Sequence, residues 1–209
     1  MIRAVICDFG GVLTTPLIRS FVAYQEHSGI SIADLGQAMA RMTEETGAHP
    51  LYELERGRIT EREFLGGIER ALGGGATLDG FSETYFEHLD RNEPMIDCMR
   101  GLRDRGFRMA MLTNNVREWE PLWRAKLPEI DEIFEVVVDS AFVGMRKPER
   151  EIYDLTLDRL GRDVSASECV FIDDTDVNCH TAESLGMVAV HYVEAERAIA
   201  EIEAAVSAH

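Results

Sequence analysis

Acidic, hydroxyl and amine side chains gather in four short stretches of the sequence. Asp8 ends an apolar run and precedes two glycines, and a later apolar run ends at Thr113 before two asparagines. Lys147 stands before a proline, and another apolar run ends at the paired acids Asp173 and Asp174. Carboxylates, a hydroxyl and an ammonium group around one point can attack, hold and neutralise a phosphoryl group. These stretches are therefore candidates for a single site, provided that the fold brings them together.

The elements that must position these residues alternate along the chain. An apolar run at residues 2–8 and four later runs have the pattern of buried strands, and helical patterns separate the later ones. The later strands are expected at 107–112, 133–138, 169–172 and 187–190, and the helices at 95–105, 118–126, 149–160, 175–185 and 194–205. This order predicts an α/β fold with a Rossmann-like, doubly wound and mostly parallel sheet. Ligands bind beyond the carboxyl ends of such strands, where the four stretches would meet.

The segment between the first strand and Pro94 has helical periodicity throughout. Helices are expected at 17–27, 32–45, 51–56, 60–72 and 81–89. Thr60 and Glu63 have the spacing of a capping box, and Gly73–Gly75 should end that helix. We therefore expect an all-α cap domain of residues 16–92, inserted into an α/β core made of residues 1–15 and 93–209.

The composition excludes several classes of partner. The 209 residues include 21 basic and 38 acidic side chains, a net charge of −17, which disfavours nucleic acid and anionic membrane surfaces. No apolar stretch approaches the about 20 residues of a membrane helix, and the chain opens on a strand pattern without a signal segment. Four cysteines (Cys7, Cys98, Cys169 and Cys179) lack CxxC spacing, so we expect reduced thiols, no zinc site and a cytoplasmic protein. The oligomeric state, monomer or homodimer, stays open.

The acidic residues themselves predict a metal ion. Asp8, Asp173 and Asp174 would converge at the sheet edge, where like charges raise one another's pKa. Mg²⁺ relieves this repulsion, because it is a hard cation that prefers oxygen ligands. Lys147 would add a fixed positive charge, and Asn178, one helical turn beyond Asp174, could orient the acids.

The four stretches, taken together and in order, resemble the four motifs of the haloacid dehalogenase superfamily of hydrolases. The matching segments are Asp8-Phe-Gly-Gly-Val-Leu, Leu112-Thr-Asn-Asn, Arg146-Lys-Pro and Asp173-Asp-Thr-Asp-Val-Asn. The chain is most similar to the branch with a helical cap inserted after the first motif. That branch includes the phosphatase domain of soluble epoxide hydrolases and sugar-phosphate phosphatases.

The resemblance implies a Mg²⁺-dependent phosphomonoester hydrolase that acts on a small phosphorylated metabolite. Asp8 would be the nucleophile that becomes an aspartyl-phosphate, and Lys147 would hold the nucleophile and the phosphate together. Thr113 and Asn114 would bind the phosphoryl group. The implied Mg²⁺ ligands are Asp8, Asp174 with Asp173 beside it, and the main-chain carbonyl of Gly10.

One departure from the family pattern concerns Gly10. Phosphatases of the family usually carry an aspartate two residues after the nucleophile, which protonates the leaving group and then activates water. Glycine has no proton to give, and such acid–base help is typically worth about 10² to 10⁴ in rate. A phospho-acceptor or binding protein without turnover is therefore an alternative. A 2-haloacid dehalogenase is a further one, although its chemistry needs no metal and so does not explain the acid pair.

Other conspicuous residues are interpreted as structural. The cap residues in question, Tyr52, Phe64, Tyr85, Phe86 and His88, are expected to pack between helices. Trp119 and Trp123 are spaced to share one apolar helix face. Asp176 is expected to be a first-turn helix acid, His180 to lie outside the site, and Cys7 to point away from it into the core.

Overall fold

A parallel five-stranded sheet forms the centre of the protein in the computed structural model, which describes residues 1–161 and 163–208. Arg162 and His209, within the predicted core segment 93–209, lie outside the described residues. The strands are β1 (Ala4–Cys7), β2 (Arg108–Thr113), β3 (Val136–Asp139), β4 (Cys169–Asp173) and β5 (Val188–His191). Their order is β3-β2-β1-β4-β5. The chain thus winds outward from β1 in one direction and then from β4 in the other, which confirms the predicted doubly wound α/β fold.

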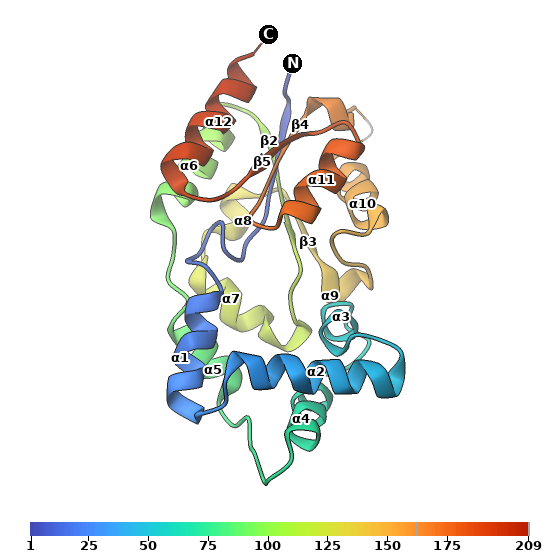
Figure 1. Cartoon of the computed structure of the whole chain (residues 1–209). Coiled ribbons are helices and arrows are strands. Elements are labelled where there is room, and N and C mark those ends of the chain that lie inside the picture. The colour runs from blue at the N-terminus through green and yellow to red at the C-terminus, as the bar shows by residue number, and fades with distance from the viewer. Residues whose placement is uncertain (162, 209) are drawn as a thin grey trace.

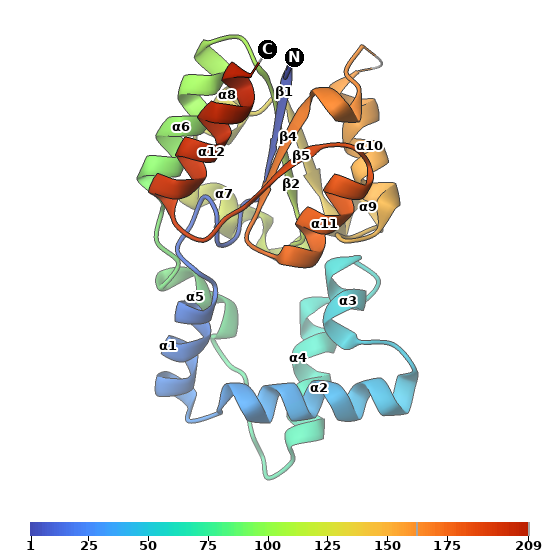
Figure 2. The same cartoon turned by 45° about the horizontal axis from the view of Figure 1, so that its top comes forward.

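Helices cover both faces of this sheet (Figures 1 and 2). One face packs against α6 (Glu93–Asp104), α7 (Glu120–Lys126), α8 (Ile130–Ile133) and α12 (Ala195–Ser207). The other face packs against α10 (Arg150–Leu160) and α11 (Asp176–Ser184). Three short elements complete this part of the chain: α9 (Ser140–Val143) and the 3₁₀ turns η1 (Arg117–Trp119) and η2 (Ala166–Glu168). Among the described residues, no helix is both long enough and apolar enough to cross a membrane.

Strand β1 is buried on both faces, which explains its unbroken apolar sequence. Val5 and Cys7 belong to the core beneath α6 and α12, whereas Ala4 and Ile6 belong to the core beneath α10 and α11. All four side chains are fully buried, as expected for a central strand of a doubly wound sheet. Cys7 is therefore a core residue, as predicted. Asp8 follows at the carboxyl end of this strand.

A second group of helices lies beyond the carboxyl ends of the strands (Figure 2). It consists of α1 (Ile18–Ser28), α2 (Ile32–Thr46), α3 (Pro50–Glu55), α4 (Glu61–Leu72) and α5 (Phe81–Glu87). These five helices are called the cap helices below. These helices have an apolar cluster of their own, to which the core adds Val116. The capping box is present, since Thr60 Oγ1 accepts from the Glu63 amide and the Glu63 carboxylate accepts from the Thr60 amide.

The chain leaves and re-enters the core at one place. A bridge between Thr14 and Arg91 joins the outgoing and returning segments, and the Asn92 amide donates to the carbonyl of Leu13. These contacts lie next to the predicted cap boundaries after residue 15 and before residue 93. The boundaries themselves stay a prediction.

Two expected elements differ from the structure. The predicted strand 133–138 begins later, because Ile133 belongs to α8 and the Phe134 amide closes that turn on the carbonyl of Ile130. The predicted helix 118–126 is divided into η1 and α7. Pro121 stands in the first turn of α7, where its missing amide hydrogen costs nothing.

Asp139, at the end of β3, makes the stability of the protein depend on pH. Its side chain caps α9 by accepting from the Ala141 amide at 3.0 Å, and only 6% of the residue is exposed. Burial raises its pKa from the ordinary 3.8 to about 7. Between these values the unfolded chain has lost a proton that the folded protein keeps. Stability should therefore fall as the pH rises from about 4 to about 7.

Asp139→Asn should remove this dependence while it keeps an oxygen for the cap. We expect the variant to match the wild type near pH 4 and to exceed it at pH 8 by a few kcal/mol of unfolding free energy. Urea unfolding at both pH values measures the difference. Parallel pH profiles of the two proteins would show that Asp139 is not the responsible group.

Candidate active site

Three residues predicted from the sequence form one buried ion-paired cluster where β1 and β4 end. Lys147 Nζ lies 2.8 Å from Asp8 Oδ1 and 2.6 Å from Asp173 Oδ2. Only 1% of Lys147 is exposed, and a buried ammonium group is tolerated only when charged partners of this kind surround it. The cluster occupies the point where the winding direction of the sheet reverses, which is the usual ligand position in this type of fold.

Burial acts in opposite directions on the pKa values of Asp8 and Lys147, but neighbouring charges leave both values raised. Burial raises the pKa of Asp8, which Lys147 opposes and Asp173 reinforces. Burial lowers the pKa of Lys147, but Asp173 and Asp8 outweigh it and raise that pKa above its ordinary value. Lys147 is therefore a permanent cation and the counterion of both acids.

Asp173 is held by protein groups at both of its oxygens. Oδ2 contacts Lys147, and Oδ1 accepts from the Thr175 amide and from Asn178 Nδ2, each at 2.9 Å. Asn178 thus orients an acid of the pair, as predicted. With both oxygens engaged and the residue fully buried, the geometry favours Asp173 as the anchor of Lys147 over a role as a direct metal ligand.

Asp174 packs against the glycine turn that follows Asp8. A Cβ atom on Gly11 would lie 2.2 Å from Asp174 Oδ2, and the φ angle of Gly11 is +79°. Both the close approach and the left-handed backbone therefore require glycine at this position. Burial, reinforced by the neighbouring Asp173, raises the pKa of Asp174.

The acid cluster fits a divalent cation. One carboxylate oxygen each from Asp8, Asp173 and Asp174 lie within 4.8 Å of one another. When all three acids are ionised, Lys147 balances one of their charges and leaves two for a cation. The oxygen-only donor set and the surplus charge match the preferences of Mg²⁺.

Gly10 has an apolar neighbour in place of an acid. A Cβ atom on Gly10 would lie 3.2 Å from Leu17 Cδ2 and 3.3 Å from Leu17 Cδ1. Gly10 is not among the glycines with positive φ, so its backbone suits any residue. The leucine methyl groups therefore border the space that an aspartate side chain would enter.

Thr113 ends β2 beside the cluster, and Asn114 follows it in the chain. Thr113 is 1% exposed and, with Asn114, faces the cavity described below. Asn114 Nδ2 donates to the Lys147 carbonyl at 3.0 Å, and its Oδ1 accepts from the Lys147 amide at 2.8 Å. The side chain predicted to bind substrate thus uses both of its polar groups to fix the Lys147 backbone, which favours a positioning role.

Ion pairs between the cap and the core lie next to this site and were not predicted. Arg146 pairs with Glu55 at the end of α3, and its guanidinium lies 4.0 Å from the centre of the Tyr52 ring. Arg56 pairs with Glu149. Burial raises the pKa of Glu55, which Arg146 opposes. The sequence shows these charges beside the motifs, but nothing in it indicates which partners would meet.

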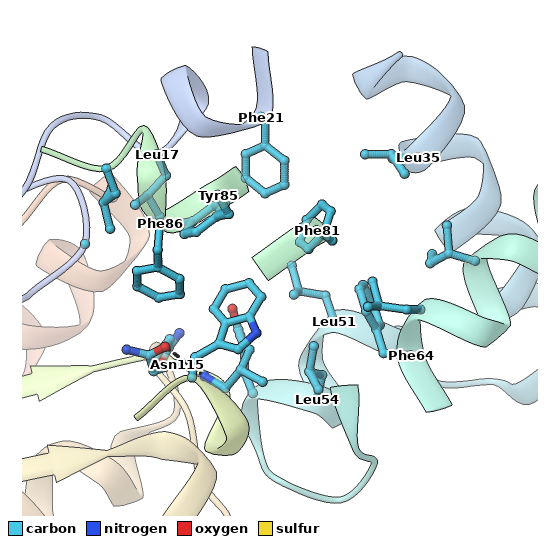
Figure 3. A pocket seen from close by; sticks show the side chains of 18 of the residues that line it. Leu17, Phe21, Leu35, Leu51, Leu54, Phe64, Phe81, Tyr85, Phe86 and Asn115 are labelled. Atoms are coloured by element: carbon cyan, nitrogen blue, oxygen red, sulfur yellow. Dashed lines mark hydrogen bonds between the residues drawn. The ribbon is translucent and has the colours of Figure 1, made fainter. Parts of the chain in front are cut away.

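A cavity of about 380 Å³ opens beside the cluster, between the cap and the core. The core supplies Phe9, Gly10, Thr113 and Asn114, and the cap supplies leucine, isoleucine, methionine and aromatic side chains. Figure 3 shows the labelled cap side chains around a common space.

Several aromatic residues do more than was expected of them. Phe64, Tyr85 and Phe86 belong to buried apolar clusters, as predicted, and they also line the cavity. Trp119 and Trp123 do not lie on one continuous helix, since Trp119 ends η1 and Trp123 belongs to α7. Trp119 lines the cavity against Tyr85 and Phe86, whereas Trp123 is buried with its ring 5.6 Å from that of Phe9.

The remaining structural interpretations concern exposed residues. Asp176 and His180 pair on the surface of α11, with side chains 68% and 66% exposed. Asp176 is thus a first-turn helix acid, as predicted. Tyr52 stacks on His49, and His88 contacts the carbonyl of Thr84 within its own helix region; neither lines the cavity.

The sequence pattern of the haloacid dehalogenase-like hydrolases matches residues 2–186, which include all four motifs. The chain belongs to this family. Mouse acyl-CoA dehydrogenase family member 10 is 30% identical over 208 residues, 97% of this chain but only 19% of that longer protein. Sesquiterpene phosphatase astK of Aspergillus oryzae is 29% identical over 203 residues, 92% of this chain and 90% of the phosphatase.

The haloacid dehalogenase-like fold is also seen in solved structures. A HAD family enzyme from Bacteroides thetaiotaomicron, in complex with magnesium and inorganic phosphate, superposes with a TM-score of 0.70 and 22% identity. The match covers 91% of this chain and 93% of that enzyme. The likeness establishes the shared fold, and the family assignment identifies a hydrolase.

Proposed function

We propose that this hydrolase cleaves phosphomonoesters of a small metabolite, with Asp8 as the nucleophile and Mg²⁺ as the cofactor. The observation that carries the proposal is the buried pairing of Lys147 with Asp8 and Asp173 beside Asp174, next to a cavity that Gly10 and Thr113 line. A phosphatase among the relatives and a magnesium- and phosphate-bound enzyme of the same fold support it.

The contacts of Asp8 indicate which oxygen attacks. Among the described residues, Lys147 Nζ and the Phe9 amide both contact Oδ1, at 2.8 Å and 2.7 Å. Oδ2 is then the oxygen that forms a bond to phosphorus while the bond to the ester oxygen breaks. Water next attacks the phosphorus of the aspartyl-phosphate, which releases inorganic phosphate and restores the carboxylate.

Other groups hold the phosphoryl oxygens and the metal. Lys147, from the loop before α10, and the Thr113 hydroxyl, at the end of β2, would both face the transferred group. Asp8, Asp174 and the Gly10 carbonyl would hold Mg²⁺, with Asp173 anchoring Lys147 behind them. When bound, the ion supplies positive charge that neutralises the oxygens of the phosphoryl group.

Phosphate release from a panel of phosphorylated metabolites, with acetyl phosphate as the smallest member, tests this proposal. We expect release with Mg²⁺, loss of most of the rate in EDTA, and recovery when Mg²⁺ is restored. Ca²⁺ should inhibit, because its larger and looser coordination shell misplaces the nucleophile and the phosphate. An unchanged rate in excess EDTA would refute the metal assignment.

A phospho-acceptor without turnover is the second candidate, and the surroundings of Gly10 favour it. The Leu17 methyl groups beside Gly10 provide no acid or base to activate water. Incubation with acetyl phosphate followed by mass spectrometry separates the two functions. A phosphoryl adduct on Asp8 that persists for hours supports the acceptor, whereas an adduct that turns over supports the hydrolase.

A further inference from the structure

We propose that the cavity binds an apolar organic group, so that the preferred substrates are phosphate esters of lipid-like alcohols instead of sugars. The proposal rests on the phosphatase function for the position of the phosphate. It extends that function to the part of the substrate that is not transferred.

The walls of the cavity are apolar over nearly their whole extent. Residues from all five cap helices contribute, with Phe21, Leu35, Leu54, Phe64 and Phe81 among them (Figure 3). The volume of about 380 Å³ falls in the range of small-molecule sites. A space of this kind gains free energy when it takes up hydrocarbon.

Three polar side chains that line the cavity already bond to the protein. Glu55 pairs with Arg146, Asn114 holds the Lys147 backbone, and Asn115 Oδ1 accepts from the Val116 amide.

The polar groups of the two remaining residues, Trp119 and Tyr85, offer a sugar few further hydrogen bonds. Trp119 Nε1 donates to Glu61 at 2.7 Å. Tyr85, 5% exposed, lines the cavity and adds a single hydroxyl group. A sugar would therefore bury several hydroxyl groups without partners, which is costly.

The apolar space continues directly from the catalytic cluster. Gly10 and Thr113, which flank the proposed phosphoryl position, also line the cavity. The carbon attached to the ester oxygen would thus leave the site between Leu17 and the aromatic rings of α5.

Binding of n-alkyl phosphonates tests the proposal without requiring turnover. Titration calorimetry of the wild-type protein with Mg²⁺ would compare ethyl, butyl, hexyl and octyl phosphonate at concentrations below micelle formation. We expect Kd to fall about fourfold for each buried methylene. Equal Kd values across the series would overturn the proposal.

Hexyl phosphate and glucose 6-phosphate form a matched pair for hydrolysis. Both contain six carbons and a primary ester oxygen, so they differ mainly in their hydroxyl groups. We expect kcat/KM to be at least tenfold higher for hexyl phosphate. The reverse preference would also overturn the proposal. Absence of hydrolysis of every ester, and of acetyl phosphate as well, would instead refute the phosphatase function and leave the binding series to decide.

A charge placed inside the cavity provides a second test. Leu51 of α3 lines the cavity and is only partly buried, whereas Val22 of α1 is 42% exposed and does not line it. Leu51→Glu should weaken octyl phosphonate binding by at least tenfold, and Val22→Glu should change it less than twofold. Equal effects of the two variants would contradict the proposal. Circular dichroism checks folding, and if Leu51→Glu does not fold, the wild-type series decides.

Discussion

Asp8→Asn is expected to lower phosphate release by at least about 10³-fold while the protein stays folded. An amide cannot attack phosphorus, yet its oxygen can still accept from the Phe9 amide and face Lys147, as Asp8 Oδ1 does. Phosphate release with acetyl phosphate and Mg²⁺ measures the loss. More than a few per cent of residual turnover would contradict the covalent mechanism.

Two controls separate lost chemistry from lost structure. Asp176→Asn makes the same change at an acid whose side chain is 68% exposed and paired only with His180, so activity should stay within twofold. Asp8→Asn also removes one of three clustered negative charges and leaves Lys147 paired with Asp173. Without Mg²⁺, its unfolding temperature should therefore equal or exceed that of the wild type.

The convergence of the site could be predicted because it depends on strand ends. Asp8, Thr113 and Asp173 each close an apolar run, and parallel pairing brings the ends of β1, β2 and β4 to one edge. Local sequence determines where a strand ends, and parallel pairing then places these ends at the same edge of the sheet. The partners of Lys147 could not be derived in this way, since a loop residue has no register that fixes its direction.

The function of the cap side chains could not be predicted, for a physical reason. Helical periodicity marks Phe64, Tyr85 and Phe86 as inward-facing, but it does not tell whether another side chain or an open space lies opposite. Trp119 and Trp123 show a second limit. The four-residue rule assumes one continuous helix, yet Trp119 ends a 3₁₀ turn and α7 begins after it, so the rule does not apply to this pair.

Gly10→Asp should change how the rate depends on the leaving group. In the wild type, no aspartate protonates the departing oxygen, so the rate should fall steeply as that oxygen becomes more basic. Aryl phosphates should then react far faster than alkyl phosphates. An aspartate at position 10 would supply the proton, and by the usual worth of acid–base catalysis it should raise the alkyl rate relative to the aryl rate by about 10²-fold.

The structure admits this substitution with a small adjustment. The Gly10 backbone lies outside the left-handed region, and the contact to relieve is the 3.2 Å approach to the flexible end of Leu17. Gly10→Asn is the matched control, because it has the same shape but no acidic proton. Gly10→Asp combined with Leu17→Ala provides more room, should the leucine hold the new carboxyl away from the site.

The ratio of alkyl to aryl kcat/KM decides the outcome, because it cancels any general loss of activity. We expect a flatter leaving-group dependence in Gly10→Asp than in both the wild type and Gly10→Asn. If the wild type already shows the flat dependence, another residue supplies the proton. The Tyr85 hydroxyl is then the group to test, because burial and the charges of Asp174, Glu55 and Asp8 raise its pKa and keep it protonated. In that case Tyr85→Phe should steepen the dependence, and Gly10→Asp should restore the flat one in the double variant.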